Sequence, residues 1–318
     1  MINFFDKLYS SVNDKNKFLS RMRIYSLFRF LIRLTANIIL PIYFYLTQYS
    51  ENNKLKHTVR NNNNNLIIVS LTSFPARISR LWLTIETIMR QTQKPDKIIV
   101  WLSKQQFSDI NFLPNSLLRL QKRGLEIRLC NEDLQSHKKY YYAIKEFPND
   151  IIITVDDDVF YNTKLIDNLI SLNKKFPKCV CCNYCTEIKI LDNQIQPYLT
   201  WDNYYISKIP DFKIFPIGKG GILYPPKILN SNVLNSDIFT EKCIFADDIW
   251  LNIMTKMANN MVVKSNYNSQ FLPVMNYKDI TLTEINVNEG LNDKQLIDVR
   301  NYCINYLGKD PFEKILIS

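Results

Sequence analysis

The sequence IIITVDDDVFY, residues 151–161, decides the predicted fold. Its first five residues, Ile151–Val155, are apolar or β-branched, and Asp156, Asp157 and Asp158 follow directly. A short apolar run bounded by polar residues is typical of a strand buried on both faces, as in a parallel sheet. Ligands of open α/β sheets bind beyond the carboxyl ends of the strands. This stretch therefore predicts a buried strand that delivers three carboxylates to a binding site.

The same order of strand and helix precedes and follows this stretch. Strands are predicted at 66–71, 97–102, 125–130 and 151–155, and helices at 78–89, 116–123, 136–147 and 164–175. Four such units require crossover connections, which favour a largely parallel sheet with helices on its faces.

The pattern changes after Pro177. Short strands are predicted at 179–185, 187–191 and 195–199, with a hairpin turn at Asp192-Asn193. Residues 200–246 are interpreted as mostly loop, and helices are predicted at 247–259 and 291–307. We therefore expect one α/β domain over residues 66–318, whose mixed second half, 161–318, supplies a pocket.

The positive charge of the chain is unevenly distributed. The formal net charge is +10, of which residues 1–60 carry +7. A basic arm thus precedes a nearly neutral body, which excludes a uniformly basic nucleic-acid coat and directs attention to what the arm contacts. The asparagine run at 61–65 is the predicted linker between arm and body.

The arm contains a predicted basic amphipathic helix. Ile24, Leu27, Leu31 and Leu34 recur on one helical face, and the arginines at 21, 29 and 33 occupy the other, with Lys15 nearby. Such a helix suits the surface of an anionic membrane. Packing on the body or on a second subunit is the first alternative. A true span is the second, although the uncharged run at 34–50 is shorter than the ~20 residues that spanning requires.

Seven cysteines are present, four of them at 179, 181, 182 and 185. An odd number in a chain with ample core material indicates reduced thiols, and we expect a cytoplasmic protein on the inner face of the membrane. Buried strand cysteines are the favoured interpretation of the cluster. A zinc site is the alternative, but two adjacent cysteines without a nearby histidine suit tetrahedral coordination poorly.

The three consecutive aspartates predict a divalent cation. Neighbouring carboxylates raise one another's pKa, and a cation relieves that repulsion. Asp156 and Asp158 share one side of an extended backbone, so Asp157 is expected to point away. Oxygen ligands favour Mn²⁺ or Mg²⁺, which bind carboxylates together with substrate phosphates. A solvated acidic turn is the alternative.

A second acidic pair, Asp247-Asp248, opens an apolar helix. Capping the helix requires only one aspartate, which leaves the other for acid–base chemistry. Gly218-Lys219-Gly220-Gly221 lies between the two acidic groups, and neither phosphate-loop spacing nor a GxGxxG fingerprint is present. These glycines are predicted to let the backbone approach a sugar or to form a mobile lid.

Six segments jointly resemble GT-A-fold glycosyltransferases, and more closely the family-2-like enzymes of bacterial capsule and lipopolysaccharide biosynthesis. They are SLTSFPARI at 70–78, QTQKPDK at 91–97, DLQSHKKYYY at 133–142, ITVDDDVFY at 153–161, IGKGGILYPP at 217–226 and DDIWL at 247–251. The resemblance implies a Rossmann-like GT-A fold whose half 66–160 binds the nucleotide and whose half 161–318 binds the acceptor.

The resemblance also implies roles for individual residues, which are assigned here by position in the matching motifs. Thr72 and Arg77 would line the nucleotide, and Lys139 would face the diphosphate, although Gln135-Ser136 replaces the usual Gly-Pro. Asp156 and Asp157 would face the donor, while Asp156 and Asp158 would hold the metal. Asp248 would activate the acceptor, with Asp247 as the fallback. The late histidine ligand of many such enzymes has no counterpart.

The implied function is metal-dependent transfer of a sugar from a nucleotide-sugar donor to a glycan or lipid-linked acceptor in cell-surface polysaccharide synthesis, with inversion if the attack is direct. Two alternatives stay open. One is a metal-dependent phosphotransferase or phosphatase, which also uses strand-end aspartate. The other is a non-catalytic, membrane-docked sugar-binding module. The sequence does not define an oligomeric state.

Overall fold

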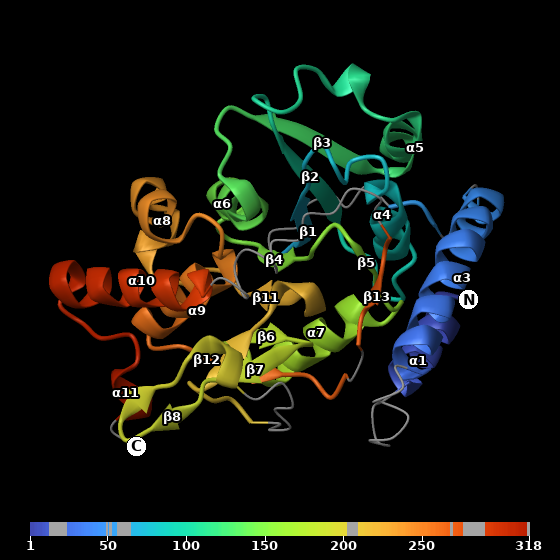
Figure 1. Cartoon of the computed structure of the whole chain (residues 1–318). Helices are drawn as coiled ribbons and strands as arrows, with labels where there is room; N and C mark the ends of the chain where they lie inside the picture. Colours follow the sequence, from blue (N-terminus) through green and yellow to red (C-terminus); the bar gives the residue numbers. More distant parts are fainter. Residues whose placement is uncertain are drawn as a thin grey trace.

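The fold centres on a seven-stranded mixed sheet (Figure 1). The computed structural model describes residues 1–12, 24–48, 50, 53–55, 65–201, 209–267, 270–275 and 290–316. The strand order is β12 (Met261–Lys264), β6 (Cys179–Cys182), β11 (Ile222–Tyr224), β4 (Ile151–Thr154), β1 (Ile67–Thr72), β2 (Lys97–Ser103) and β3 (Leu125–Cys130). Within this sheet, all strand pairings except those of β11 are parallel, which confirms the predicted α/β class.

The first four predicted strands lie within about one residue of their expected bounds. The side chains of β1, β2 and β4 alternate between two buried faces, as a sheet covered on both sides requires, whereas the edge strand β3 has one face only partly buried. One face packs against α4 (Leu81–Met89) and α7 (Leu165–Lys175). The other packs against α6 (Lys138–Glu146). The predicted helix at 116–123 is instead a short α5 (Asn115–Leu118) followed by a 3-10 turn that ends at Gly124, whose φ is 101°.

The second half departs further from the prediction. Residues 200–246 were expected to be loop, yet they contain β10 (Ile214–Pro216), β11 and α8 (Ser236–Cys243). Strand β11 inserts between β6 and β4 and runs antiparallel to both. The strands predicted at 187–191 and 195–199 shorten to β8 (Ile190–Leu191) and β9 (Gln194–Ile195), joined by the predicted turn with positive φ at both central residues. Three-residue strands carry too little periodicity to be recognised in a sequence.

Two further helices close the second half. Helix α9 (Asp247–Met257) lies against β10 and β12, and α10 (Leu291–Leu307) has the predicted bounds. The cysteines at 179, 181, 182 and 185 lie in β6 and in β7 (Cys185–Glu187) and are all at most 5% exposed. Their side chains divide between two separate cores, as expected of buried strand residues.

The N-terminal arm is packed against the body. Its two described helices, α1 (Ile2–Ser11) and α3 (Ile24–Thr47), lie side by side (Figure 1). Ala36, Leu40 and Phe44 of α3 are fully buried against a core that includes Phe160 and β13 (Leu272–Pro273). By length and composition α3 could cross a membrane, because it has 24 residues and contains an 18-residue window with a mean hydropathy of 1.5. The predicted linker lies outside the described residues except for Asn65.

The outer face of α3 is apolar. Leu27, Leu31 and Leu34, the predicted apolar face, are exposed. Arg29 donates instead to the carbonyl oxygen of Val12, from Nε at 3.1 Å and Nη2 at 2.8 Å. Arg33 lies over the ring of Phe30. The arm thus meets the body through one face while its apolar face is directed outward; Lys15 and Arg21 lie outside the described residues.

Candidate functional site

All eight predicted site residues line one cavity of about 520 Å³ at the carboxyl ends of β1 and β4. They are Thr72, Arg77, Lys139, Asp156, Asp157, Asp158, Asp247 and Asp248. The parallel pairing of β1 with β4 brings the end of the first strand beside the acidic motif. The antiparallel strand β11 then brings the preceding Gly218–Gly221 segment to the same edge. The cavity thereby gathers predicted site residues that are up to 176 positions apart in the sequence, from Thr72 to Asp248.

The acidic motif does not continue the strand that precedes it. Strand β4 ends at Thr154, Asp156 follows outside the strand, and Asp157 and Asp158 lie in a bend. The expectation that Asp157 points away from Asp158 is therefore wrong, since it assumed an extended backbone. Nη1 of Arg77 lies 2.9 Å from Oδ1 of Asp157 and 2.8 Å from Oδ2 of Asp158.

Asp157 is the buried member of the motif. It accepts a hydrogen bond of 2.5 Å from Oγ of Ser73, and its backbone carbonyl accepts one from Thr84. Burial raises the pKa of Asp157, against the opposing effects of Arg77 and Ser73. These contacts fix the motif to the loop after β1. The sequence analysis missed Ser73, although it lies inside the SLTSFPARI segment.

Lys139 joins the two acidic groups. It is buried on α6, with its Nζ 2.8 Å from Oδ1 of Asp156 and 3.0 Å from Oδ2 of Asp247. Burial lowers the pKa of Lys139, but Asp156, Asp247 and Asp248 outweigh it and raise the pKa well above its usual value. The lysine is therefore a permanent cation at the centre of the site, with the geometry to attract a phosphate.

The two aspartates at the start of α9 differ in protonation. Neither side chain caps the helix. Burial raises the pKa of Asp247, but Lys139 and His137 outweigh it, and the net pKa is lowered. Burial and the charge of Asp247 raise the pKa of Asp248 to about 8. Asp247 is therefore the fixed anion, and Asp248 is a carboxyl group that titrates near neutral pH.

Gly218 allows these groups to meet. Its backbone N–H donates to Oδ2 of Asp248 at 3.0 Å. A Cβ at this position would lie 3.1 Å from Nζ of Lys139 and 3.2 Å from Oδ1 of both Asp156 and Asp248. The close approach of backbone predicted for this segment thus involves side chains of the site. Lys219 lines the same cavity, and burial lowers its pKa against the charges of Asp158 and Asp156.

The site offers oxygen ligands that suit a hard cation. Asp156 and Asp158 line one cavity, and Oδ1 of Asp248 is buried without a hydrogen-bond partner. Within the described part of the chain, no group of three or more His, Cys, Asp or Glu residues is arranged to hold a metal. Two aspartates therefore fit Mn²⁺ or Mg²⁺ only if phosphate and water oxygens complete the coordination.

Thr72 and His137 have mainly structural contacts. The hydroxyl of Thr72 donates to the carbonyl of Trp101 at 2.7 Å, which fixes the end of β1 at the cavity. His137 is fully buried, stacks on Phe239 and contacts Tyr140 and the carbonyl of Cys243 through its ring nitrogens. Burial lowers the pKa of His137 to about 4, so it is neutral. The histidine therefore has a structural role.

Comparison with known proteins finds distant structural matches, among them the three that follow. No protein-family model matches the sequence, and no curated protein matches it. A mannosyltransferase from Pyrobaculum calidifontis, solved with GDP-mannose and Mn²⁺, is 12% identical over 90% of this chain and 78% of its own, with a TM-score of 0.48. An apo UDP-glucose pyrophosphorylase is 8% identical over 64% of this chain and 91% of its own, with a TM-score of 0.39.

The third match is glucosyl-3-phosphoglycerate synthase from Mycobacterium tuberculosis, solved with Mn²⁺, UDP and glucosyl-3-phosphoglycerate. It is 12% identical over 41% of this chain, with a TM-score of 0.31, and the match spans about half of its length. All three TM-scores lie below 0.5, so the case for a function depends on the residues of the site.

Proposed function

We propose that this chain is a metal-dependent glycosyltransferase that moves a sugar from a nucleotide-sugar donor to a glycan or lipid-linked acceptor. The observation that carries the proposal is Lys139, a buried cation that contacts both Asp156 of the strand-end motif and Asp247 of the second acidic pair. A site for a leaving diphosphate thereby lies beside a carboxyl group suited to proton transfer.

The donor would bind in the half of the cavity formed by the loop after β1. Thr72 and Arg77 line that half and would contact the nucleotide, with Asp157 holding Arg77 in place. Asp156 and Asp158 would hold Mn²⁺ or Mg²⁺, which stabilises negative charge on the departing diphosphate when bound. Lys139 would add a second positive charge on the same leaving group. Donor binding would have to displace Arg77 from Asp158.

The acceptor would bind near the start of α9. Asp248 would take the proton of the attacking hydroxyl group, since a pKa of about 8 is well matched to proton transfer near neutral pH. Asp247 would stay ionised and hold Lys139 in position. Direct attack on the anomeric carbon would invert its configuration. The carboxyl group must first lose its proton, so activity is expected to rise with pH.

We place the reaction at the cytoplasmic face of a membrane, in cell-surface polysaccharide synthesis of the capsule or lipopolysaccharide type. Support comes from the outward apolar face of α3, which would bring the site near a lipid-linked acceptor.

The test is whether the purified full-length chain turns over a panel of nucleotide sugars in the presence of Mn²⁺. Turnover is measured as the release of nucleoside diphosphate. Asp158→Ala is expected to lose both transfer and metal-dependent nucleotide binding. Asp248→Asn is expected to keep nucleotide binding and lose transfer by at least 100-fold, the scale of general-base catalysis.

Three outcomes would contradict the proposal. Hydrolysis of phosphoesters without turnover of any nucleotide sugar would favour the phosphatase alternative. Tight sugar-nucleotide binding without turnover would favour a binding module. Full activity of Asp158→Ala in a metal chelator would remove the role of the metal.

A further inference from the structure

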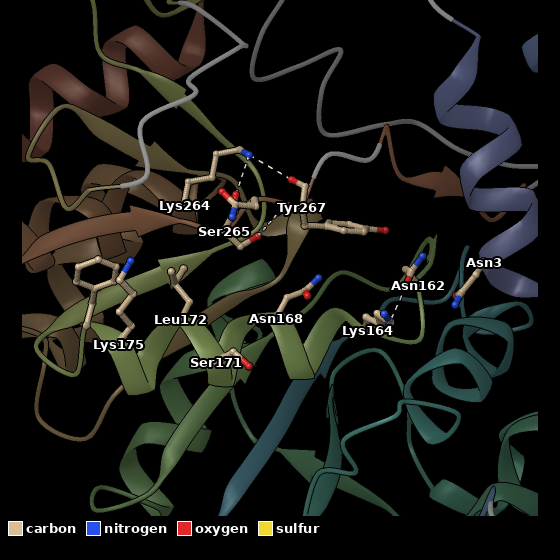
Figure 2. Close-up of a pocket in the computed structure, with 12 residues that line it drawn as sticks. Asn3, Asn162, Lys164, Asn168, Ser171, Leu172, Lys175, Lys264, Ser265 and Tyr267 are labelled. Carbon is tan, nitrogen blue, oxygen red and sulfur yellow. Dashed lines mark hydrogen bonds between the residues drawn. The ribbon is translucent and has the colours of Figure 1, made fainter.

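A second cavity, of about 580 Å³, lies between α7, the end of β12 and α1, away from the acidic site (Figure 2). Among the residues that the structure describes, its lining contains three lysines and no carboxylate: Asn3, Asn162, Lys164, Asn168, Ser171, Leu172, Lys175, Phe176, Lys264, Ser265, Asn266 and Tyr267. We call it the lysine pocket. A concave surface with three cations, amides and hydroxyl groups has the chemistry of a site for a phosphate-bearing anion.

The wall of the lysine pocket is fixed by hydrogen bonds. Nζ of Lys264 donates to the carbonyl oxygens of Ser265 and Tyr267, at 3.1 and 3.2 Å (Figure 2). Behind the wall, Asp6 accepts hydrogen bonds from Asn162 at 2.8 Å and from the hydroxyl of Tyr267 at 2.7 Å. Asp6 is only 5% exposed and is not among the described residues that line the pocket.

The arm forms one side of the lysine pocket. Asn3 of α1 points into it (Figure 2). It is held by two hydrogen bonds with Thr163, of 2.8 and 3.0 Å. Helix α1 exposes Phe4, which is 63% accessible, and Lys7, one turn beyond Asn3. The cationic pocket therefore borders an exposed apolar side chain.

A second exposed apolar surface lies on α3, the helix that packs beside α1. Seven large side chains of this helix are at least 45% exposed: Leu27, Phe28, Leu31, Ile38, Ile42, Tyr45 and Leu46. A soluble monomer rarely exposes so continuous an apolar face, which marks an interaction site. The two arginines of this helix that the structure describes, Arg29 and Arg33, contact Val12 and Phe30 and do not lie on that face. Cations for an anionic partner are instead provided by the lysine pocket.

Helix α3 is held parallel to the body surface. Its fully buried residues include Leu40 and Phe44. The side chain of Asn37 donates to the carbonyl of Pro273 at 3.1 Å and accepts from the N–H of Met275 at 2.9 Å. A helix that crossed a bilayer would have to release these contacts, and Asn37 would lose its partners. The contacts therefore favour insertion in the plane of the membrane.

We propose that the lysine pocket binds the phosphate headgroup of an anionic phospholipid while the apolar face of α1 and α3 inserts among the acyl chains. The proposal deepens the membrane association suggested above for the glycosyltransferase. It commits to a bilayer because an apolar face bordered by a cationic pocket complements an anionic interface.

The test is flotation of the full-length chain with vesicles of phosphatidylcholine alone or mixed with phosphatidylglycerol. Wild-type protein is expected to bind the mixed vesicles more tightly, and high salt should reduce the difference. The triple change Lys164→Gln, Lys175→Gln and Lys264→Gln should weaken partition to mixed vesicles on the order of 100-fold, roughly fivefold per lysine. The double change Leu31→Gln and Ile38→Gln should weaken binding to both kinds of vesicle.

The matched control removes three exposed or half-exposed lysines elsewhere: Lys189→Gln, Lys242→Gln and Lys294→Gln. The proposal is overturned if both triple variants lose the same affinity, if wild-type protein binds the two vesicle types equally, or if it forms a dimer in solution that protects α3 from solvent exchange. Transfer to a soluble acceptor separates the two ideas. Lipid binding that fails while transfer persists refutes only the headgroup site, and the reverse refutes only the enzyme.

Discussion

Replacing Asp248 by asparagine should stabilise the protein, and increasingly so as the pH rises. A carboxyl group with a pKa of about 8 in the folded state and about 4 in the unfolded chain keeps a proton on folding that it releases on unfolding. The free energy of unfolding of the wild-type protein should therefore fall as the pH rises from about 4 to about 8. The slope is about 1.4 kcal/mol per pH unit, so roughly 4 kcal/mol is lost between about pH 5 and pH 8.

Asparagine keeps the shape of the side chain and does not titrate. It can still accept the hydrogen bond from Gly218, so Asp248→Asn should keep its stability through the same window. Asp248 is partly exposed, which reduces the expected difference to on the order of 2–4 kcal/mol. Urea unfolding followed by circular dichroism, at several pH values with both proteins, measures this difference.

The neighbouring aspartate provides the control of opposite sign. Asp247→Asn removes a partner of Lys139 and leaves a buried cation with only Asp156 in contact. It should destabilise the fold by roughly 1–3 kcal/mol. If the stability difference between Asp248→Asn and wild type is the same at every pH, Asp248 does not have a raised pKa. The assignment of Asp248 as the titrating carboxyl group and Asp247 as the fixed anion is then wrong.

Three further predictions concern the pH dependence of transfer, the glycine segment and the buried Lys256. The rate of transfer should rise with pH to a plateau above about pH 8, and a flat initial-rate profile would contradict the role of Asp248. Gly220→Ala would bring a Cβ to 2.4 Å from Cβ of Tyr184 and should lower the melting temperature, whereas Gly218→Ala, which crowds only side-chain tips, should mainly weaken nucleotide binding in calorimetry. Burial lowers the pKa of Lys256 to about 7 in the folded protein, whereas the pKa of an unfolded lysine is near 10, so the folded protein loses stability as the pH falls through this range. Lys256→Met should therefore raise the free energy of unfolding near pH 6 by a few kcal/mol in urea titrations, and no gain would contradict this.

Local pattern was enough to predict the first half of the fold. The strands at 66–71, 97–102 and 151–155 were recognisable because each is a largely apolar run, and each is buried on both faces. The strand at 125–130 instead alternates apolar residues with Glu126 and Arg128, which are only partly buried. The order of strand and helix then required a parallel sheet. The eight candidate site residues also came from the sequence and its resemblance, and all of them line one cavity.

Pairwise contacts within that cavity were not predictable from the sequence. The bend after Thr154 let Arg77 contact Asp157 and Asp158 together, whereas the prediction assumed an extended chain. The three-residue strand β11, which brings the glycine segment to the site, has no periodicity that a sequence can display.

The sequence by itself determined which chemical groups this protein has at its strand ends, because short-range sequence patterns predict both the buried strands and the order of strands and helices. Only the tertiary structure decided which of those groups are charged. Asp247 and Asp248 are adjacent and chemically identical in the sequence, yet Lys139 lies beside one and a backbone N–H beside the other. Their pKa values diverge because burial and neighbouring charges, both set by residues distant in the chain, act differently on each.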